Sequence, residues 1–293
     1  MYIVSKETCI YSMCAANEPA LSVAPGSRIE FETWDALKGQ LKNADDGFDL
    51  LDWSCVNPAT GPVYINGAEP GDILSVKIEK IDVADSGIVV CGPGMGIVRD
   101  GVLDVATTKV IPVAGDVAHF SDEIKIPLNK MIGVIGTAPA GEAIPCGAPD
   151  LHGGNMDCKE VREGATLLLP VNVPGALLAM GDLHAVMADG EICVTGIEIA
   201  GSITVTVDII KGKVLPLPMI INESHVMTLA SDADLDTAVD MAVDNMVSYL
   251  VNAEGFTPSD AVMLTSLVGD VRICQVVDPK KTIRVEFPRK YLR

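Results

Sequence analysis

The chain has 293 residues and a mass of 30.8 kDa, and its 40 acidic and 21 basic residues give a formal net charge of −19. Hydrophobic residues make up 48% of the chain, so it can bury a core that offsets the entropy of an ordered chain, which excludes a disordered protein. The acidic surface repels phosphate and no stripe of lysine and arginine is present, so no nucleic-acid partner is expected.

Three sequence features predict a protein of the cytoplasm. The most apolar stretch, residues 165–180, is broken by Pro170 and Pro174, and no run of about 18 or more apolar residues exists, so no membrane contact is expected. Lys6 and Glu7 lie where a signal peptide needs its apolar segment. The eight cysteines form no CxxC pair, which favours reduced, mostly buried thiols over a redox pair or zinc knuckle.

Residues 1–215 form a region dense in short β-like runs separated by glycine, proline and aspartate. Gly-Asp pairs recur in this region, and they favour turns because glycine supplies positive φ and aspartate bonds its own backbone. Strands at this spacing, with little helical periodicity between them, predict a sandwich or barrel. The clearest predicted strands are 73–81, 108–112, 165–173 and 202–211.

The chain changes character at residue 216, and residues 216–293 are predicted to form an α+β unit packed on the β-rich region. Apolar residues from 235 to 250 recur at helical spacing, and aspartates crowd the start of this helix, where its dipole favours anions. Thr257 and Pro258 predict the start of a second helix. Two strands, 271–277 and 282–287, follow across a turn at Asp278. The predicted fold is therefore mainly β, with a C-terminal α+β unit.

The richest stretch for chemistry runs from His152 to Glu191 and holds two of the four histidines. His152 lies near Asp157, and His184 lies two residues after Asp182, so on a strand these last two side chains point to the same face. Imidazole and carboxylate are ligands that suit zinc and similar divalent ions. The alternative from the pattern alone is that these are turn aspartates and half-exposed histidines.

Further candidate residues lie in this stretch and upstream of it. Asn155 offers a donor and an acceptor for a small polar substrate. Glu69, in a loop, is either a solvated turn residue or a base at a cleft, and Asp35 adds a carboxylate in an apolar neighbourhood. Cys158 could act as a nucleophile with a histidine as its base, which is the alternative to a metal site.

The sequence resembles the acetamidase/formamidase family over nearly its whole length. The resemblance is carried, in order, by FETWDALKGQL at 31–41, VNPATGPVYINGAEPGDIL at 56–74, IKIPLNKMIGVIGTAP at 124–139, IPCGAPDLHGGNMD at 144–157, LLLPVNVPGALLAMGDLHAVMADGEI at 167–192 and SDAVMLTSLVGDVRICQVVDP at 259–279. It implies a β-rich hydrolase with an α+β C-terminal part that releases ammonia from small aliphatic amides. Asn66 stands where an acid is common in the family, and Glu69 is retained.

From these residues and this resemblance we predict metal-assisted hydrolysis of a short amide such as formamide or acetamide. A divalent ion, expected to be zinc with calcium as a candidate second ion, lowers the pKa of its water. Glu191, or failing that Glu69, accepts the water proton and passes it to ammonia, and Asn155 contacts the amide. The predicted metal ligands are His152, Asp157, His184, Asp35 and Asp182.

Other functions stay open at this point. They are a cysteine-dependent hydrolase, a hydrolase of larger or cyclic amides, and a member of the family that binds a ligand or metal without turnover. High aliphatic content with few aromatic residues suggests that another subunit covers apolar surface, so a homodimer is expected.

Overall fold

The computed structural model describes residues 1–47 and 51–293. In the described residues, one sheet has nine strands and a second has eleven. The first sheet contains, from edge to edge, β1 (Tyr2–Val4), β5 (Arg28–Thr33), β18 (Gly201–Ile210), β7 (Ile73–Val83), β15 (Thr166–Pro170), β19 (Met219–Ile221), β20 (His225–Asp232), β22 (Lys281–Pro288) and β21 (Asp270–Gln275).

The second sheet is branched. Its main path is β11 (Lys125–Pro127), β10 (Val117–His119), β9 (Thr107–Ala114), β8 (Ser86–Cys91), β17 (Glu198–Ile199), β16 (Leu178–His184), β12 (Met131–Gly136) and β14 (Gly153–Asn155). β6 (Ala59–Ile65) pairs with β16 and with β2 (Cys9–Ile10) and β4 (Leu21–Val23). A separate pair joins β3 (Ser12–Met13) to β13 (Ile144–Pro145), and short 3-10 turns lie at Trp53–Cys55 and Arg289–Tyr291.

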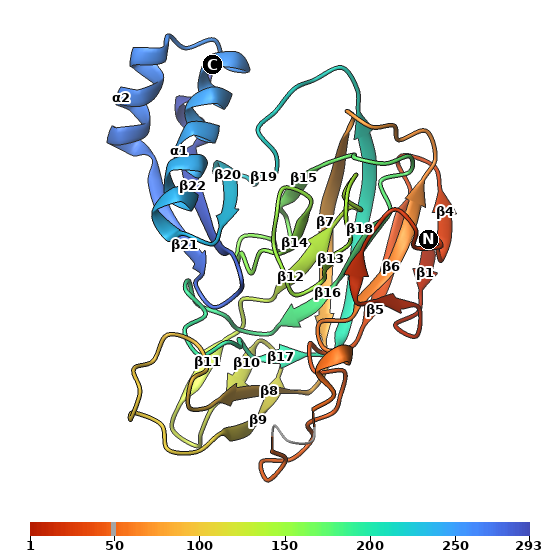
Figure 1. The fold of residues 1–293 in the computed structure, drawn as a ribbon, viewed down its shortest axis with the longest axis vertical. Coiled ribbons are helices and arrows are strands. Elements are labelled where there is room, and N and C mark those ends of the chain that lie inside the picture. The colour runs from red at the N-terminus through yellow and green to blue at the C-terminus, as the bar shows by residue number, and fades with distance from the viewer. Residues whose placement is uncertain (48–50) are drawn as a thin grey trace.

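The main core lies between the two sheets. Alternate side chains of β5, β7, β15 and β18 meet those of β6, β12 and β16 in one buried aliphatic cluster, as period-2 strands require. Figure 1 shows these strands side by side, with β8 to β11 extending as a separate lobe below them. All four strands predicted in the β-rich region are present, at β7, β9, β15 and β18, so the mainly β prediction is confirmed.

The C-terminal α+β unit is also present as predicted. Helix α1 (Leu235–Asn252) packs its apolar face on β20 and β22, where Ala238, Ala242 and Met246 are buried in a second core. Helix α2 (Pro258–Val268) packs beside α1 (Figure 1). Strands β19 to β22 of this unit continue the nine-stranded sheet through β15, so one sheet runs across the division expected at 215/216. Neither described helix is long and apolar enough to cross a membrane.

Helix α2 begins at the residues that the sequence indicates. Thr257 is the N-cap, and its hydroxyl accepts a hydrogen bond from the amide of Asp260 at 3.2 Å. This bond satisfies one of the amides that a helix start leaves unpaired.

We expect Thr257→Ala to lower the free energy of unfolding by about 1 kcal/mol, because the N-cap hydrogen bond is lost. Urea unfolding followed by circular dichroism measures this change. The matched control is Thr257→Ser, which keeps the hydroxyl and is expected to retain the wild-type midpoint. Equal midpoints for the alanine variant and the wild type would contradict the prediction.

Candidate metal and active site

The site begins with one cross-strand pair in the second sheet. His184 at the end of β16 lies directly opposite Glu198 on β17, so the two side chains share a face of the sheet. His184 Nε2 is 3.0 Å from Glu198 Oε1 and 3.3 Å from Asp182 Oδ1. Leu183, which lies between Asp182 and His184 in β16, points to the opposite face of the sheet and into the main core. The alternation of β16 therefore separates the polar site from the apolar core.

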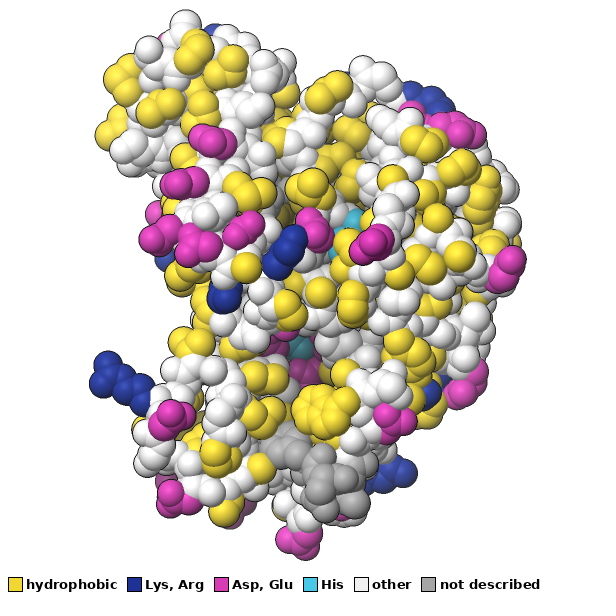
Figure 2. Space-filling model, viewed as in Figure 1, with side chains coloured by type: hydrophobic (Ala, Val, Ile, Leu, Met, Phe, Trp, Pro, Cys, Tyr) yellow, Lys and Arg dark blue, Asp and Glu magenta, His cyan; other side chains and the backbone are white. Residues whose placement is uncertain are grey.

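Two further carboxylates complete what we call the carboxylate–histidine cluster, which consists of Asp157, Asp182, His184, Glu191 and Glu198. Their ligand atoms form two groups that could each hold a metal ion, Asp157–His184–Glu191 and Asp182–His184–Glu198. In each group the three atoms lie within 4.8 Å of one another. All five side chains are buried, and His184 belongs to both groups. Figure 2 shows a histidine with acidic side chains beside it in a hollow of the molecular surface.

Three members of the cluster have an unusual backbone conformation. Asp157, Asp182 and Glu191 have φ of 42°, 54° and 46°, in the left-handed region that costs L-residues roughly 1–3 kcal/mol each. The structure around them must offset this cost, and such strain gathers at functional sites. Gly190 precedes Glu191 with φ of 101°, which glycine adopts without strain, and the Glu191 side chain that follows is buried.

Several buried polar atoms of the cluster have no hydrogen-bond partner among the described residues. They include His184 Nε2, Asp157 Oδ1, Asp182 Oδ1 and Glu198 Oε2. A buried polar atom left without a partner costs about 1–3 kcal/mol, so native proteins rarely leave several together. An imidazole nitrogen surrounded by carboxylate oxygens is the donor set that a divalent ion such as zinc accepts. The side chains therefore fit a bound divalent cation.

The pKa shifts of the cluster residues also favour a bound cation. Burial, together with neighbouring carboxylates, raises the pKa of Glu191 and of Asp157 well above their usual values. Burial opposes a charge on His184 as well, yet Glu198 and Asp182 raise the pKa of this imidazole well above its usual value. Four buried acids around one imidazole repel one another, and the charge of a divalent cation would relieve that repulsion.

Asn155 and Asp278 lie at the edge of this cluster. Asn155 Nδ2 donates a hydrogen bond to Asp278 Oδ2 at 3.0 Å, while Asn155 Oδ1 is buried and has no partner in the part of the chain that the structure describes. Asp278 lies in the turn between β21 and β22, and burial and the charge of Asp182 raise its pKa to about 8. The C-terminal unit thus contributes a side chain to the site. The sequence marks Asp278 only as a turn residue.

Asp35 lies near the cluster, and Glu69 lies outside it. The Asp35 carboxylate accepts backbone hydrogen bonds from Leu37 and Gly39. Burial and, in smaller part, the charge of Asp182 raise its pKa. Glu69 is exposed in the turn between β6 and β7, where its amide bonds to Asp72.

His152 is buried but separate from the carboxylate–histidine cluster. Both of its ring nitrogens lack a hydrogen-bond partner in the described structure, and its charged neighbours are Asp150 and Lys280. It belongs to neither metal-ligand group found among the described residues. Gly153 and Gly154, with φ of 96° and 82°, turn the backbone between His152 and Asp157. Of the predicted ligands, Asp157, Asp182 and His184 belong to these groups, and His152 and Asp35 do not.

His152 should make stability depend on pH. Burial lowers its pKa from 6.5 to about 4, so between these values the unfolded chain binds more protons than the folded one. Its contribution to stability is complete above pH 6.5 and is lost as the pH falls towards 4, amounting to about 3 kcal/mol. We expect this difference on comparing unfolding curves of wild type and His152→Phe, in which all carboxylates are retained. Parallel pH profiles for the two proteins would contradict it.

Cys158 lies in the main core and outside both metal-ligand groups. Its side chain is fully buried in the main aliphatic core. Burial opposes ionisation of this thiol, but a hydrogen bond with Cys274 and the charge of Arg284 lower its pKa below the usual value. A cysteine nucleophile needs a general base, and no histidine is among the groups that act on this thiol in the described structure.

A buried arginine holds the loop that carries Glu191. The Arg284 guanidinium, on β22, donates to Asp189 Oδ1 and Oδ2 at 2.7 and 2.9 Å and to Glu286 at 2.7 Å. The amide of Gly190 donates to the carbonyl of Cys274 at 2.8 Å. These contacts fix the two residues before Glu191, so β21 and β22 position a site residue of the β-rich region.

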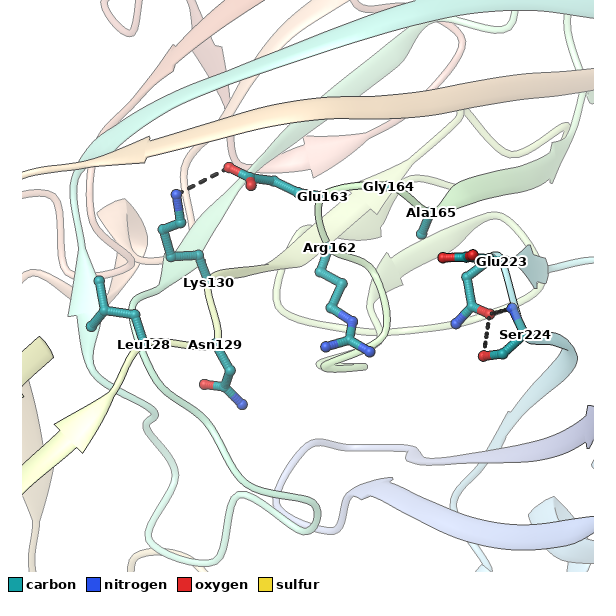
Figure 3. Close-up of a pocket in the computed structure, with 10 residues that line it drawn as sticks. Leu128, Asn129, Lys130, Arg162, Glu163, Gly164, Ala165, Glu223 and Ser224 are labelled. Atoms are coloured by element: carbon teal, nitrogen blue, oxygen red, sulfur yellow. Dashed lines mark hydrogen bonds and ion pairs between the residues drawn. The ribbon is translucent and has the colours of Figure 1, made fainter. Parts of the chain in front are cut away.

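A large cavity lies elsewhere, between the loop before β12, the loop before β15 and the β19–β20 turn. It has a volume of about 470 Å³ and is drawn in Figure 3. Its charged side chains are largely paired, Lys130 with Glu163 at 3.0 Å and Arg162 with Glu160 at 2.9 Å. No member of the carboxylate–histidine cluster lines it. We therefore place the chemistry at the cluster.

Comparison with known proteins identifies the family. The profile of the Acetamidase/Formamidase family matches residues 16–145 and 140–290, so the chain belongs to this family. The crystal structure of an acetamidase from Bacillus halodurans is similar at 42% identity, with a TM-score of 0.97 over 99% of this chain and 98% of that one.

Two curated relatives match this chain over a smaller share of its length. A formamidase of Methylophilus methylotrophus is 26% identical over 66% of this chain and 61% of its own length. An acetamidase of Mycolicibacterium smegmatis is 28% identical over 66% of this chain and 64% of its own length. The chain thus spans less than two thirds of the length of these relatives.

Proposed function

We propose that this chain hydrolyses a short aliphatic amide, such as formamide or acetamide, to the carboxylate and ammonia with the help of a divalent metal ion. The observation that carries the proposal is the buried carboxylate–histidine cluster, in which His184 Nε2 faces three carboxylates and has no hydrogen-bond partner among the described residues. Its relatives named acetamidase and formamidase support the choice of substrate class.

The proposed ligands of the ion are Asp182, His184 and Glu198. The carboxylate oxygens of Asp182 and Glu198 lie closer to His184 Nε2, at 3.3 and 3.0 Å, than that of Glu191, at 3.8 Å. Imidazole with carboxylates favours zinc. Asp157, which has only oxygen ligands to offer, would suit calcium as a second ion. A bound divalent ion would supply Lewis acidity, which makes water a better nucleophile and polarises an amide carbonyl.

Glu191 is the proposed proton carrier. Its Oε1 is 3.8 Å from His184 Nε2, and burial and the charge of Asp157 raise the pKa of this carboxyl well above its usual value, which makes it a stronger proton acceptor. It accepts a proton from the attacking water and donates it to the departing amine, which leaves as ammonia. Its left-handed backbone and the contacts of Arg284 with the preceding Asp189 hold it in place.

Asn155 is the proposed substrate-positioning residue. Because its Nδ2 is bonded to Asp278, its buried Oδ1 is free to accept a hydrogen bond from the N–H group of an amide. This contact would turn the amide nitrogen towards Asn155 and leave the carbonyl facing the cluster. Formamide and acetamide differ by one methyl group, which is worth only about 1–3 kcal/mol of discrimination, so we propose turnover of both.

The test measures ammonia release from formamide and acetamide before and after chelation, with zinc or calcium added back. We expect activity to fall with metal content and to return with zinc. Full activity in a protein shown to be metal-free would overturn the metal-assisted reaction. If the protein binds metal but hydrolyses neither amide, the proposed substrates are wrong, and only the proposal of a metal site remains. We also propose that the protein is located in the cytoplasm. The eight cysteines are scattered along the chain, and we interpret them as reduced thiols, which are typical of that compartment.

A further inference from the structure

Strand β21 leaves part of one sheet edge open. It is the last strand of the nine-stranded sheet, and β22 covers its inner side. On the outer side, the described residues place only Gly190 against it, opposite Gln275. Asp270, Val271, Arg272 and Ile273 are all exposed. An open strand edge presents unpaired backbone groups and can pair with another strand.

The charges on this open edge are self-complementary. Asp270 and Arg272 point to one face of the strand and form an ion pair within it at 2.9 Å. If a second copy pairs antiparallel with Val271 opposite its counterpart, each Asp270 lies opposite an Arg272 of the other copy. Moving the register by one residue in each chain places Asp270 opposite Asp270, or Arg272 opposite Arg272. Opposite charges in cross-strand pairs stabilise and like charges destabilise, so the charges select one register.

The length of the open edge fits the same register. With Val271 on the two-fold axis, Gly269 lies opposite Ile273, so the pairing spans residues 269–273 in both copies. It ends before Gln275, where Gly190 already lies against the strand. The pairing therefore needs no change in the loop that carries Glu191.

Apolar side chains near this edge are also exposed. Val271 and Ile273 are 46% and 38% exposed, and Met263 and Leu267 on α2 are 55% and 77% exposed. Figure 2 shows hydrophobic side chains gathered over the lobe that carries α1 and α2. Exposed apolar residues that gather beside an open, charge-patterned strand are typical of an association surface.

We propose that two copies of this chain associate through β21, antiparallel about a two-fold axis at Val271, to form one sheet that continues through both copies. A two-fold interface uses the same surface on both subunits, which the alternation of Asp270 and Arg272 satisfies. The partner is a second copy of this chain. The C-terminal unit then has two roles, because it holds the Glu191 loop through Arg284 and joins the subunits through β21.

The experiment measures molar mass by sedimentation velocity over a range of protein concentrations. The wild type should sediment with twice the 30.8 kDa mass of the chain, or as a larger assembly that contains this dimer. Asp270→Arg and Arg272→Asp each place like charges opposite each other in both cross-strand pairs, so each should weaken this association step about tenfold or more. The swapped double variant D270R/R272D restores opposite charges and should associate like the wild type.

Mixing the two single variants gives the sharpest test. A chain with two arginines and a chain with two aspartates are complementary, so the mixture should form a heterodimer that neither forms alone. Circular dichroism confirms that each variant is folded. A monomeric wild type, single variants that keep the wild-type mass, or a mixture that does not associate would each overturn the proposal. The test reads mass alone, so it is independent of the amide-hydrolysis proposal.

Discussion

Replacement of His184 by alanine is expected to remove the bound metal and to lower kcat/KM by at least about 100-fold. Loss of a residue that only hydrogen-bonds to a metal ligand already lowers activity by up to about 100-fold, and loss of the ligand itself should cost at least as much. His184 Nε2 is shared by both ligand groups, so a single change takes a ligand from each. The imidazole packs closely against Gly196 and its Nδ1 lies 3.3 Å from Met187 Sδ, so the ring has one fixed orientation. Metal content by mass spectrometry and ammonia release measure the two effects.

The matched control is His225→Ala. His225 is half-buried at the start of β20, and its Nδ1 pairs with Ser224 Oγ at 2.8 Å, away from the cluster. This variant should keep its metal and its turnover. Glu198→Gln adds a variant of nearly unchanged shape that loses one ligand charge, and it should lose metal while remaining folded. If His184→Ala keeps full metal content and turnover, His184 is not a ligand.

The parts of the fold that local chemistry determines could be predicted from the sequence. Thr257, Pro258 and Asp260 carry the start of α2 within four residues, and the structure has the capping hydrogen bond there. The alternation in residues 202–211 predicts β18, and the apolar spacing from 235 to 250 predicts α1. In each case the signal lies within one element, so no knowledge of its neighbours is needed.

The site depends on contacts that are distant in the sequence, and there the prediction was incomplete. Glu198 lies between two isoleucines in a two-residue strand, and only pairing with β16 places it opposite His184. Asp278 reaches Asn155 across 123 residues of sequence. The one available signal was an acid within an apolar run at Glu198, which a buried strand would not contain without a partner.

His152 is a predicted ligand that lies outside both metal-ligand groups. It shares the HGGNMD segment with Asp157, and the spacing of five residues left open whether the two converge. Gly153 and Gly154 both have positive φ and pair with β12 in β14. Beyond them Asp157 belongs to a metal-ligand group, whereas the buried His152 ring before them does not. The path of the chain between the two residues includes these two glycine conformations, which residue types alone do not specify.

Gly133→Ala is expected to abolish metal binding and amide turnover while leaving most of the fold intact. Gly133 lies on β12, and a Cβ built there would be 2.4 Å from Asp157 Oδ1 and 2.5 Å from Asp182 Oδ2. Neither carboxylate can move easily, because both residues have a strained positive φ and buried surroundings. The added methyl should therefore displace both carboxylates, lower kcat/KM by at least about 100-fold and reduce the free energy of unfolding by about 1–3 kcal/mol.

The matched control for this substitution is Gly141→Ala. Gly141 is exposed, has an ordinary φ, and has no atom within 4 Å of a Cβ built on it, so its variant should match the wild type in metal content, turnover and stability. The comparison isolates the methyl group beside the two carboxylates from the general effect of replacing glycine by alanine. Gly133→Ala should impair function only if metal binding and turnover need the carboxylates of Asp157 and Asp182 in their present positions. A Gly133→Ala variant that binds metal and releases ammonia at the wild-type rate would show that the function does not depend on this arrangement of the two carboxylates.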